Sequence, residues 1–273
     1  MLKRMIPSSG ELLPVVGLGT WQTFDVSAGS EQSHLTEVLD DMRRNEGTLI
    51  DTSPMYGRAE STVGRLTSTR PDQNEFFYAT KVWTTGKDAG IQQMHSSMEK
   101  MERERMDLIQ IHNLLDWRTH LATLNTWKES GKLRYTGITH YTDSMHEELE
   151  NVFTAEKIDF VQFNYSILSR NAEKRLLAAA ADKGVATLIN RPFGEGNLFN
   201  RTHGKPLPEW CKELNINTWS QYFLAYLIAQ PEVNCVIPAT RNPEHARDNF
   251  TVDTENLPDE ATRRKMVEYL KGL

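Results

Sequence analysis

The segment LIDTSPMYGRAE, from Leu49 to Glu60, places an aspartate and a tyrosine five residues apart across a loop that contains a proline. Leu49 and Ile50 are typical of the end of a buried strand, so Asp51 stands where such a strand reaches solvent. Asp before Thr and Ser is also common in turns. The fragment alone therefore favours a capped turn with a tyrosine packed nearby. Whether Asp51 and Tyr56 have a catalytic role instead depends on the residues at the other strand ends of the chain.

Other apolar segments of the chain also end on polar side chains. Lys81 ends YATK and His112 ends LIQIH. The later segments end on Thr139, His140, Gln162, Asn164, Asn190, Arg191, Thr240 and Arg241. A lone Lys at such a position is usually a solvated surface group, and a lone His is usually a hydrogen-bonded structural residue. A barrel, however, brings the carboxyl ends of all its strands to one face. Asp51, Tyr56, Lys81 and His112 would then meet there.

Reduction of a carbonyl group is the reaction that these four side chains suit. A tyrosine hydroxyl has a reference pKa of about 10, and a neighbouring ammonium lowers such a pKa by roughly 1–3 units. We expect Lys81 to have this effect on Tyr56, while Asp51 pairs with Lys81 and fixes its position. His112 would hydrogen-bond the substrate oxygen. No side chain supplies a hydride, so the reaction implies a nicotinamide cofactor.

Short apolar segments alternate with amphipathic ones along most of the chain. The strand candidates are PVVGLGTW, GTLIDT, EFFYATKVW, MDLIQIH, LRYTGIT, IDFVQFN, GVATLIN and EVNCVIPAT. Helical spacing of apolar residues predicts helices within 34–47, 91–106, 120–132, 171–185 and 217–230. This alternation predicts βαβ units and a parallel sheet. Eight strands in a chain of this length predict an α/β fold, a (β/α)8 TIM barrel made by residues 1–273 as one domain.

An open doubly wound sheet is the alternative fold. It would show a glycine-rich phosphate loop after its first strand, whereas GLGTW, Gly17 to Trp21, supplies only G-x-G. A Gly/Pro-rich segment from Arg191 to Trp210 follows the seventh predicted strand. In a barrel this end of the strand faces the active site, so we expect the segment to act as a lid or a cofactor clasp.

Composition and charge restrict the class of protein. The chain has 273 residues, of which 38% are hydrophobic and 25% charged, as in globular proteins. A formal net charge of −6 argues against a nucleic-acid partner. The two cysteines, Cys211 and Cys235, are too few for a disulfide framework and fit a reducing compartment. Without a signal-peptide pattern or an apolar run of membrane-spanning length, we expect a cytoplasmic protein, unless an upstream targeting segment is missing.

The chain resembles the aldo-keto reductases over nearly its whole length. The matching segments are VGLGTW, IDTSPMYG, ATKVW, DLIQIHN, LRYTGITHY, DFVQFNY and VIPATRNPEHARDN. The Asp-x4-Tyr pair, the Lys and the His match the family's catalytic tetrad at Asp51, Tyr56, Lys81 and His112. The resemblance implies a barrel that binds NADPH without a Rossmann domain and transfers its hydride to an aldehyde or ketone.

The resemblance also assigns residues to the cofactor. Near the nicotinamide they are Thr20, Trp21, Thr139, His140, Gln162 and Asn190. In the loop that approaches the pyrophosphate they are Arg191, Phe193 and Gly194, and at the adenosine end Thr240, Arg241, His245 and Asn249. Gln162 matches the glutamine that hydrogen-bonds the carboxamide. His140 replaces the usual asparagine, and Asn190 stands where many members have a tyrosine that stacks on the nicotinamide.

The clearest departure from the family pattern concerns the ribose 2′-phosphate. Many members hold it with a Lys after the last strand and an Arg at the start of the next helix, where this chain has Ala239 and His245. A phosphate dianion favours a guanidinium or an ammonium, and Arg241 is only two residues from Ala239. We therefore expect NADPH to bind through Arg241, with weaker discrimination against NADH than is usual.

Three functions are compatible with these residues. The first is a reductase of small aldehydes or ketones, for which Trp21, Trp83 and Trp117 would favour apolar or ring-shaped substrates. The second is the same site working in reverse, as an NAD(P)-linked sugar or alcohol dehydrogenase. The third is a non-enzymatic nicotinamide-binding subunit that senses redox state. The expected partner is a small carbonyl compound rather than nucleic acid or a membrane, and the resemblance implies a monomer.

A metal site is the remaining alternative for part of this set. His112, Asp116 and His120 are spaced by four residues, which would place three ligands on one face of a helix. His112, however, ends a predicted strand, and the sequence has no second cluster of metal ligands. We therefore predict no metal.

Overall fold

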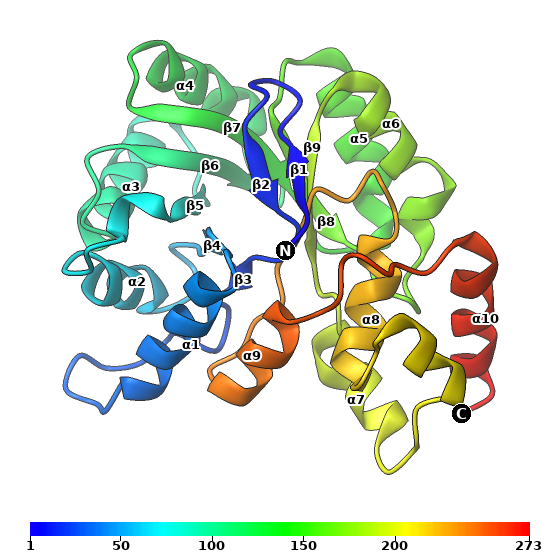
Figure 1. Cartoon of the computed structure of the whole chain (residues 1–273). Helices are drawn as coiled ribbons and strands as arrows, with labels where there is room; N and C mark the ends of the chain where they lie inside the picture. Colours follow the sequence, from blue (N-terminus) through cyan, green and yellow to red (C-terminus); the bar gives the residue numbers. More distant parts are fainter.

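Eight parallel strands form the centre of the computed structural model, which describes residues 1–273. They are β3 (Leu18–Gly19), β4 (Leu49–Asp51), β5 (Phe77–Val82), β6 (Met106–His112), β7 (Leu133–Thr139), β8 (Phe160–Asn164), β9 (Ala186–Asn190) and β10 (Cys235–Val236). Their order in the sheet follows the chain. Bridges from Val16 to Val236 and from Gly19 to Ala239 join the first strand to the last. The sheet therefore closes into the predicted (β/α)8 barrel (Figure 1).

The alternation of side chains along the strands gives the barrel an apolar interior with polar groups at one end. Phe77 and Ala79 belong to the interior cluster of 12 residues, and Leu108 does so on the next strand. Because successive side chains of a strand point to opposite faces, Lys81 and His112 continue these inward rows. The strand pattern alone thus carries the polar side chains to the inside of the barrel, at its carboxyl-terminal end.

A hairpin that was not predicted from the sequence covers the other end of the barrel. Strands β1 (Lys3–Met5) and β2 (Leu12–Pro14) pair antiparallel and lie apart from the main sheet (Figure 1). Ile6 and Leu13 from this hairpin are fully buried and complete the interior cluster. The hairpin therefore supplies part of the barrel's core.

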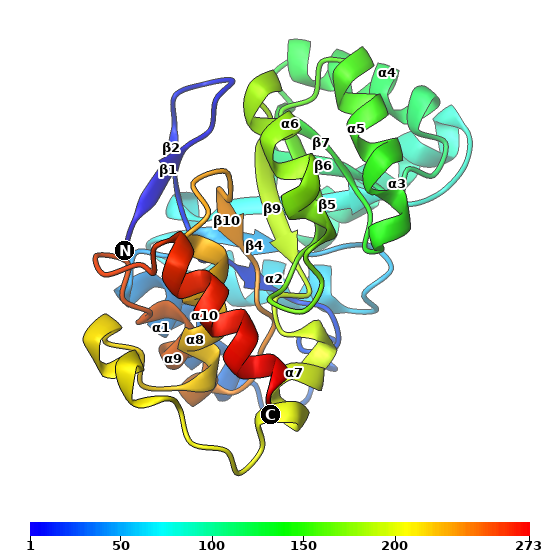
Figure 2. The same cartoon turned by 90° about the vertical axis from the view of Figure 1, so that its right-hand side faces the viewer.

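The helices surround the barrel (Figures 1 and 2). They are α1 (Ser33–Arg44), α2 (Ala59–Thr67), α3 (Lys87–Lys100), α4 (Trp117–Glu129), α5 (His146–Ala155), α6 (Leu176–Lys183), α7 (Asn197–Thr202), α8 (Trp219–Ile228), α9 (Pro243–Phe250) and α10 (Glu260–Lys271). Short 3-10 turns span Gln73–Glu75, Asp143–Met145, Asn171–Lys174, Gly194–Gly196 and Glu209–Leu214. Each of the five predicted helical segments contains or overlaps a helix, whereas α2, α5, α7, α9 and α10 were not predicted. No helix combines the length and the apolar content needed to cross a membrane.

Local capping explains where α9 begins, which matters because this helix follows the last strand of the barrel. The Asn242 side chain accepts a hydrogen bond of 2.9 Å from the backbone N–H of Glu244, and Pro243 occupies the first helical turn. Both features are strong signals for a helix start. They fix the segment from Thr240 to Asn249 beside the rim of the barrel.

Candidate active site

A buried ion pair forms the floor of the site. Asp51 ends β4, and Lys81 lies near the end of the neighbouring strand β5. The Lys81 ammonium donates to Asp51 Oδ2 at 2.7 Å and to the Thr52 carbonyl oxygen at 2.8 Å. Burial by itself lowers the pKa of Lys81, but the attraction of Asp51 and Tyr56 outweighs it, so the pKa lies above its ordinary value. The predicted pairing is confirmed, and Lys81 is charged.

Two glutamines complete the surroundings of Asp51. Gln110 and Gln162 each donate from Nε2 to Asp51 Oδ1 at 3.0 Å, and all three side chains are buried. Gln162 was predicted from the family motif, but Gln110 was not. The signal was present, because Gln110 precedes His112 by two residues on β6 and so points to the same face of the strand. The aspartate is thus held from both sides, by a cation and by two amides.

Tyr56 lies above this ion pair, on the loop between β4 and α2. The Lys81 ammonium is 5.0 Å from the centre of the Tyr56 ring. Burial raises the pKa of the Tyr56 hydroxyl above its ordinary value, although the charge of Lys81 opposes the rise. The expectation of a lowered pKa is therefore wrong for this structure, because the loss of hydration outweighs the ammonium. Tyr56 carries its proton at neutral pH.

His112 ends β6 beside Tyr56, and its imidazole is neutral. The two rings meet edge to face, with centres 5.9 Å apart and planes at 85°. His112 Nδ1 lies 3.1 Å from the hydroxyl of Ser53, on the same loop as Tyr56. Burial, together with the positive charge of Lys81, lowers the pKa of His112 to about 2. The structure thus brings the four predicted residues, Asp51, Tyr56, Lys81 and His112, to one end of the barrel.

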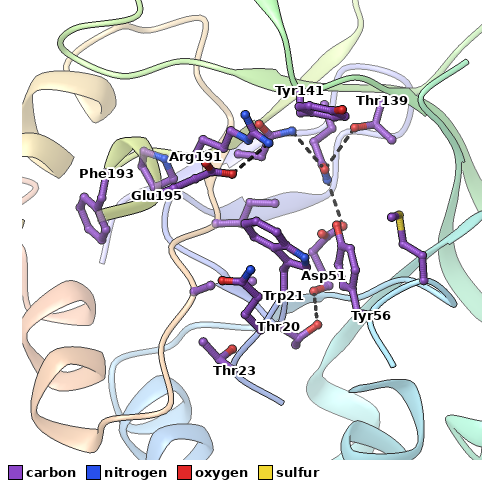
Figure 3. Close-up of a pocket in the computed structure, with 18 of the residues that line it drawn as sticks. Thr20, Trp21, Thr23, Asp51, Tyr56, Thr139, Tyr141, Arg191, Phe193 and Glu195 are labelled. Carbon is purple, nitrogen blue, oxygen red and sulfur yellow. Dashed lines mark hydrogen bonds and ion pairs between the residues drawn. The ribbon is translucent and has the colours of Figure 1, made fainter. Parts of the chain in front are cut away.

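A cavity of about 570 Å³ opens above these groups. Figure 3 shows Asp51 and Tyr56 toward one end and Glu195 and Phe193 toward the other, with Trp21 between them. Of the residues predicted from the sequence, those that line the cavity are Thr20, Trp21, Asp51, Tyr56, Trp83, His112, Thr139, Gln162, Asn190, Arg191 and Phe193. Lys81 lies beneath it, fully buried. The cavity combines a polar floor with an aromatic wall.

The rim of the cavity is apolar and accessible. Between 39% and 41% of each of five large side chains is exposed there, namely Trp21, Met55, Trp83, Tyr141 and Phe199. Exposed aromatic side chains around a concave site are typical of surfaces that bind flat or apolar ligands. Phe199 belongs to the segment from Arg191 to Trp210 that was predicted to face the active site. Met55 and Tyr141 were not predicted from the sequence, since each lies in a loop whose direction no periodicity fixes.

Polar side chains predicted to lie near a nicotinamide are joined into one network. Thr139 Oγ1 and Asn190 Nδ2 both donate to Gln162 Oε1, at 3.2 and 3.4 Å, and Asn190 Nδ2 also lies 3.2 Å from the His140 carbonyl oxygen. Gln162 Nε2 has a second acceptor in Gln110 Oε1, at 3.3 Å. Every hydrogen-bonding position of the Gln162 amide therefore has a partner within the protein.

Thr20 and His140 each contact another residue of the site. Thr20 Oγ1 donates to the Asp51 carbonyl oxygen at 3.0 Å and so fixes the end of β4. The His140 ring stacks on Tyr141, with centres 5.2 Å apart and planes at 13°. His140 does not line the cavity, whereas Tyr141 does. The His140 ring thus packs against a side chain of the cavity wall without lining the cavity itself.

The loop after β9 carries a cation over the cavity. The Arg191 guanidinium lies 4.3 Å from the centre of the Tyr141 ring and 2.9 Å from Glu195 Oε1. Arg191 and Glu195 both have left-handed backbone conformations, with φ of 53° and 57°. Gly194, between them, has a φ of 56°. The predicted lid segment therefore begins as a tight turn and continues into α7.

The residues predicted for the adenosine end lie outside the cavity lining, although Ala239 reaches it. Thr240 Oγ1 accepts from the backbone N–H of Asn242 at 3.0 Å, and Asn249 accepts from the hydroxyl of Ser220. Both side chains are buried. Arg241 and His245, in contrast, are exposed. They form no ion pair with any other residue, which leaves both side chains available to a ligand.

Asp116 and His120, which share a four-residue spacing with His112, form hydrogen bonds to a neighbouring loop. His120 Nε2 is 2.7 Å from the Thr84 carbonyl oxygen, and Asp116 accepts from the backbone N–H of Gly86 at 2.7 Å. No group of three or more His, Cys, Asp or Glu side chains is arranged to hold a metal ion. These contacts instead fix the loop between β5 and α3 against the start of α4.

Comparisons with known proteins agree with the fold. The model of the aldo/keto reductase family matches residues 15–265. An aldo-keto reductase of Mycobacterium sp. (strain KMS) is 24% identical over 90% of this chain and 85% of its own length. The NADH-specific methylglyoxal reductase of Escherichia coli is also 24% identical, over 94% of this chain and 95% of its own. A solved aldo-keto reductase from Klebsiella pneumoniae, in complex with NADPH, superposes with a TM-score of 0.80 at 21% identity, over 99% of this chain and 96% of that one.

Proposed function

The chain belongs to the aldo/keto reductase family of oxidoreductases that act on carbonyl groups, and from this premise we propose that it reduces an aldehyde or ketone to the alcohol, with Tyr56 as the proton donor. One observation carries the proposal. A protonated tyrosine and a neutral histidine lie together over a buried lysine–aspartate pair, at the floor of an open cavity. This set supplies a proton, a hydrogen-bond donor and a fixed positive charge at one place.

NADPH is the cofactor that we propose, and the residues of the cavity are chemically suited to it. Asn190 Oδ1 is a buried acceptor without a partner, and Thr139 and Gln162 lie beside it. Arg191 places a cation further along the cavity, where a pyrophosphate could be held. When bound, the reduced nicotinamide supplies the hydride that the carbonyl carbon receives. The related Klebsiella pneumoniae enzyme was solved with NADPH, which supports this choice.

The protein's own groups complete the reaction at the carbonyl oxygen. His112, held neutral, donates a hydrogen bond that orients this oxygen. Tyr56 transfers its hydroxyl proton to the oxygen as the carbon is reduced, so that the alcohol forms. The ammonium of Lys81 stabilises the tyrosinate that is left, and Asp51 keeps that ammonium in place. Water returns the proton to Tyr56 before the next turnover.

Arg241 is the residue that we propose for the 2′-phosphate of NADPH. It is exposed and unpaired, two residues after Ala239 at the cavity edge. Arg241→Ala should raise the Kd for NADPH about tenfold, the value of one charge-assisted hydrogen bond. It should leave the Kd for NADH unchanged, because NADH lacks this phosphate.

Both constants can be measured by quenching of tryptophan fluorescence, with Arg264→Ala on α10 as the matched control. Arg264 is also exposed, but its partner is Glu260 on the same helix. An unchanged Kd for NADPH in Arg241→Ala would exclude this role of Arg241.

The reaction itself is tested by following cofactor oxidation with a panel of aromatic and aliphatic aldehydes. Because aromatic side chains surround the cavity, we expect higher kcat/KM for aromatic aldehydes. Oxidation should stop when the aldehyde is omitted. Tight cofactor binding without turnover across the whole panel would instead favour a non-enzymatic nicotinamide-binding subunit.

A further inference from the structure

We propose that Ser53 is a positioning residue that holds His112 with its proton on Nε2, the ring nitrogen available to a substrate. Ser53 follows β4 and lies between Asp51 and Tyr56 in the chain. Its hydroxyl oxygen is 3.1 Å from His112 Nδ1, and both side chains are buried. The loop that carries Tyr56 therefore also contacts the second polar group at the carbonyl. The role of this contact in catalysis rests on the proposed function, whereas the proton position itself does not.

The direction of this hydrogen bond follows from counting protons. The backbone N–H of Met55 already donates to Ser53 Oγ, at 3.4 Å. The hydroxyl has one proton of its own, and His112 Nδ1 is its only acceptor. If Nδ1 carried the proton instead, the Ser53 hydroxyl would be a buried donor without an acceptor, which is unfavourable. Ser53 therefore donates, and Nδ1 accepts.

The proton of the neutral ring must then be on Nε2. A neutral imidazole carries one proton, and the hydrogen bond at one nitrogen decides which nitrogen holds it. His112 lines the cavity, and Nε2 has no partner within the protein. This N–H is thus free to donate to a substrate oxygen.

The opposite tautomer would act against the reaction. With the proton on Nδ1, Nε2 would present a lone pair to a carbonyl oxygen, and two acceptors would face each other. A histidine locked in the wrong tautomer severely impairs catalysis in other enzymes. The position of one proton, set by Ser53, thus decides whether His112 assists Tyr56.

The test compares Ser53→Ala and Ser53→Thr with the wild-type protein. Ser53→Ala removes the donor, and Ser53→Thr keeps a hydroxyl. Ser97→Ala is the matched control, since Ser97 is an equally buried serine on α3 that does not line the cavity. In Ser53→Ala we expect kcat to fall about fivefold to tenfold with the Kd for NADPH unchanged. Ser53→Thr should recover most of the loss, and Ser97→Ala should show none.

The proton position is read directly from the nitrogen spectrum of protein labelled with ¹⁵N-histidine, without cofactor. His112→Gln identifies the His112 signals by their disappearance. Wild type should show protonated Nε2 and unprotonated Nδ1, and Ser53→Ala should show a mixture of tautomers. A protonated Nδ1 in wild type, or an unchanged tautomer in Ser53→Ala, would overturn the proposal. If wild type reduced no carbonyl at all, the proposed function would fail, while this spectrum would still decide the role of Ser53.

Discussion

Removal of the lysine from the buried ion pair is the most informative perturbation of stability. Lys81→Met replaces a fully buried ammonium by a side chain of similar length and leaves Asp51, with 2% of its surface exposed, without its cation. Removing one partner of a buried pair costs about 3–5 kcal/mol. Because Gln110 and Gln162 still donate to Asp51 at 3.0 Å, we expect a value near the lower limit, about 3 kcal/mol.

The double variant Lys81→Met/Asp51→Asn makes this reasoning testable. It removes both charges and keeps an oxygen that can accept from the two glutamines. We therefore expect it to be about 2 kcal/mol more stable than the sum of the single substitutions predicts. Urea unfolding of the four proteins, followed by circular dichroism, gives the coupling free energy. If the single effects were additive, the contact between Lys81 and Asp51 would not be an energetic pair, and the floor of the site would need another explanation.

Two further predictions concern His112 and Gly64. The pKa of His112 is about 6.5 in the unfolded chain and about 2 in the folded protein. Between these values only the unfolded chain binds the proton. The free energy of unfolding therefore falls as the pH drops, by up to about 1.4 kcal/mol per pH unit. His112→Gln should therefore lose less stability than wild type between pH 6 and pH 4, measured by urea unfolding, and parallel curves would contradict this. Gly64→Ala would drive a Cβ into the Lys100 carbonyl oxygen, so we expect the free energy of unfolding to fall by about 1–3 kcal/mol although alanine favours helices. Ser61→Ala, also on α2, is its control and should be nearly neutral in thermal unfolding; equal melting temperatures for the two variants would refute the steric argument.

The barrel was predictable because its strands carry a strong local signal. All eight predicted apolar segments contain the observed strands, and residues 77–82 of β5 are buried on both faces, as a continuous apolar run indicates. The hairpin was missed because its first strand, KRM, carries two basic residues and is largely exposed, so no apolar run marks it. Ile6 and Leu13 are core residues only because the hairpin folds across the end of the barrel.

The identity of the residues that meet at the site could be predicted from the sequence, whereas their pKa values could not. Asp51, Lys81 and His112 stand at strand ends, and barrel topology brings such ends together. The pKa of Tyr56 depends on how much water the loops exclude, and sequence spacing does not contain that quantity. The contact of Ser53 with His112 joins residues 59 positions apart, so only the closed barrel reveals it.

The most direct test of the central claim, that Tyr56 is the proton donor above Lys81 and Asp51, is Tyr56→Phe. NADPH binding is measured by tryptophan fluorescence and aldehyde reduction by cofactor oxidation, on the same samples. We predict that the Kd for NADPH stays within about twofold of wild type, while kcat falls by a factor on the order of 10²–10⁴, the usual contribution of a general acid. Turnover that survives in Tyr56→Phe would contradict the account and reduce the segment from Asp51 to Tyr56 to a structural turn.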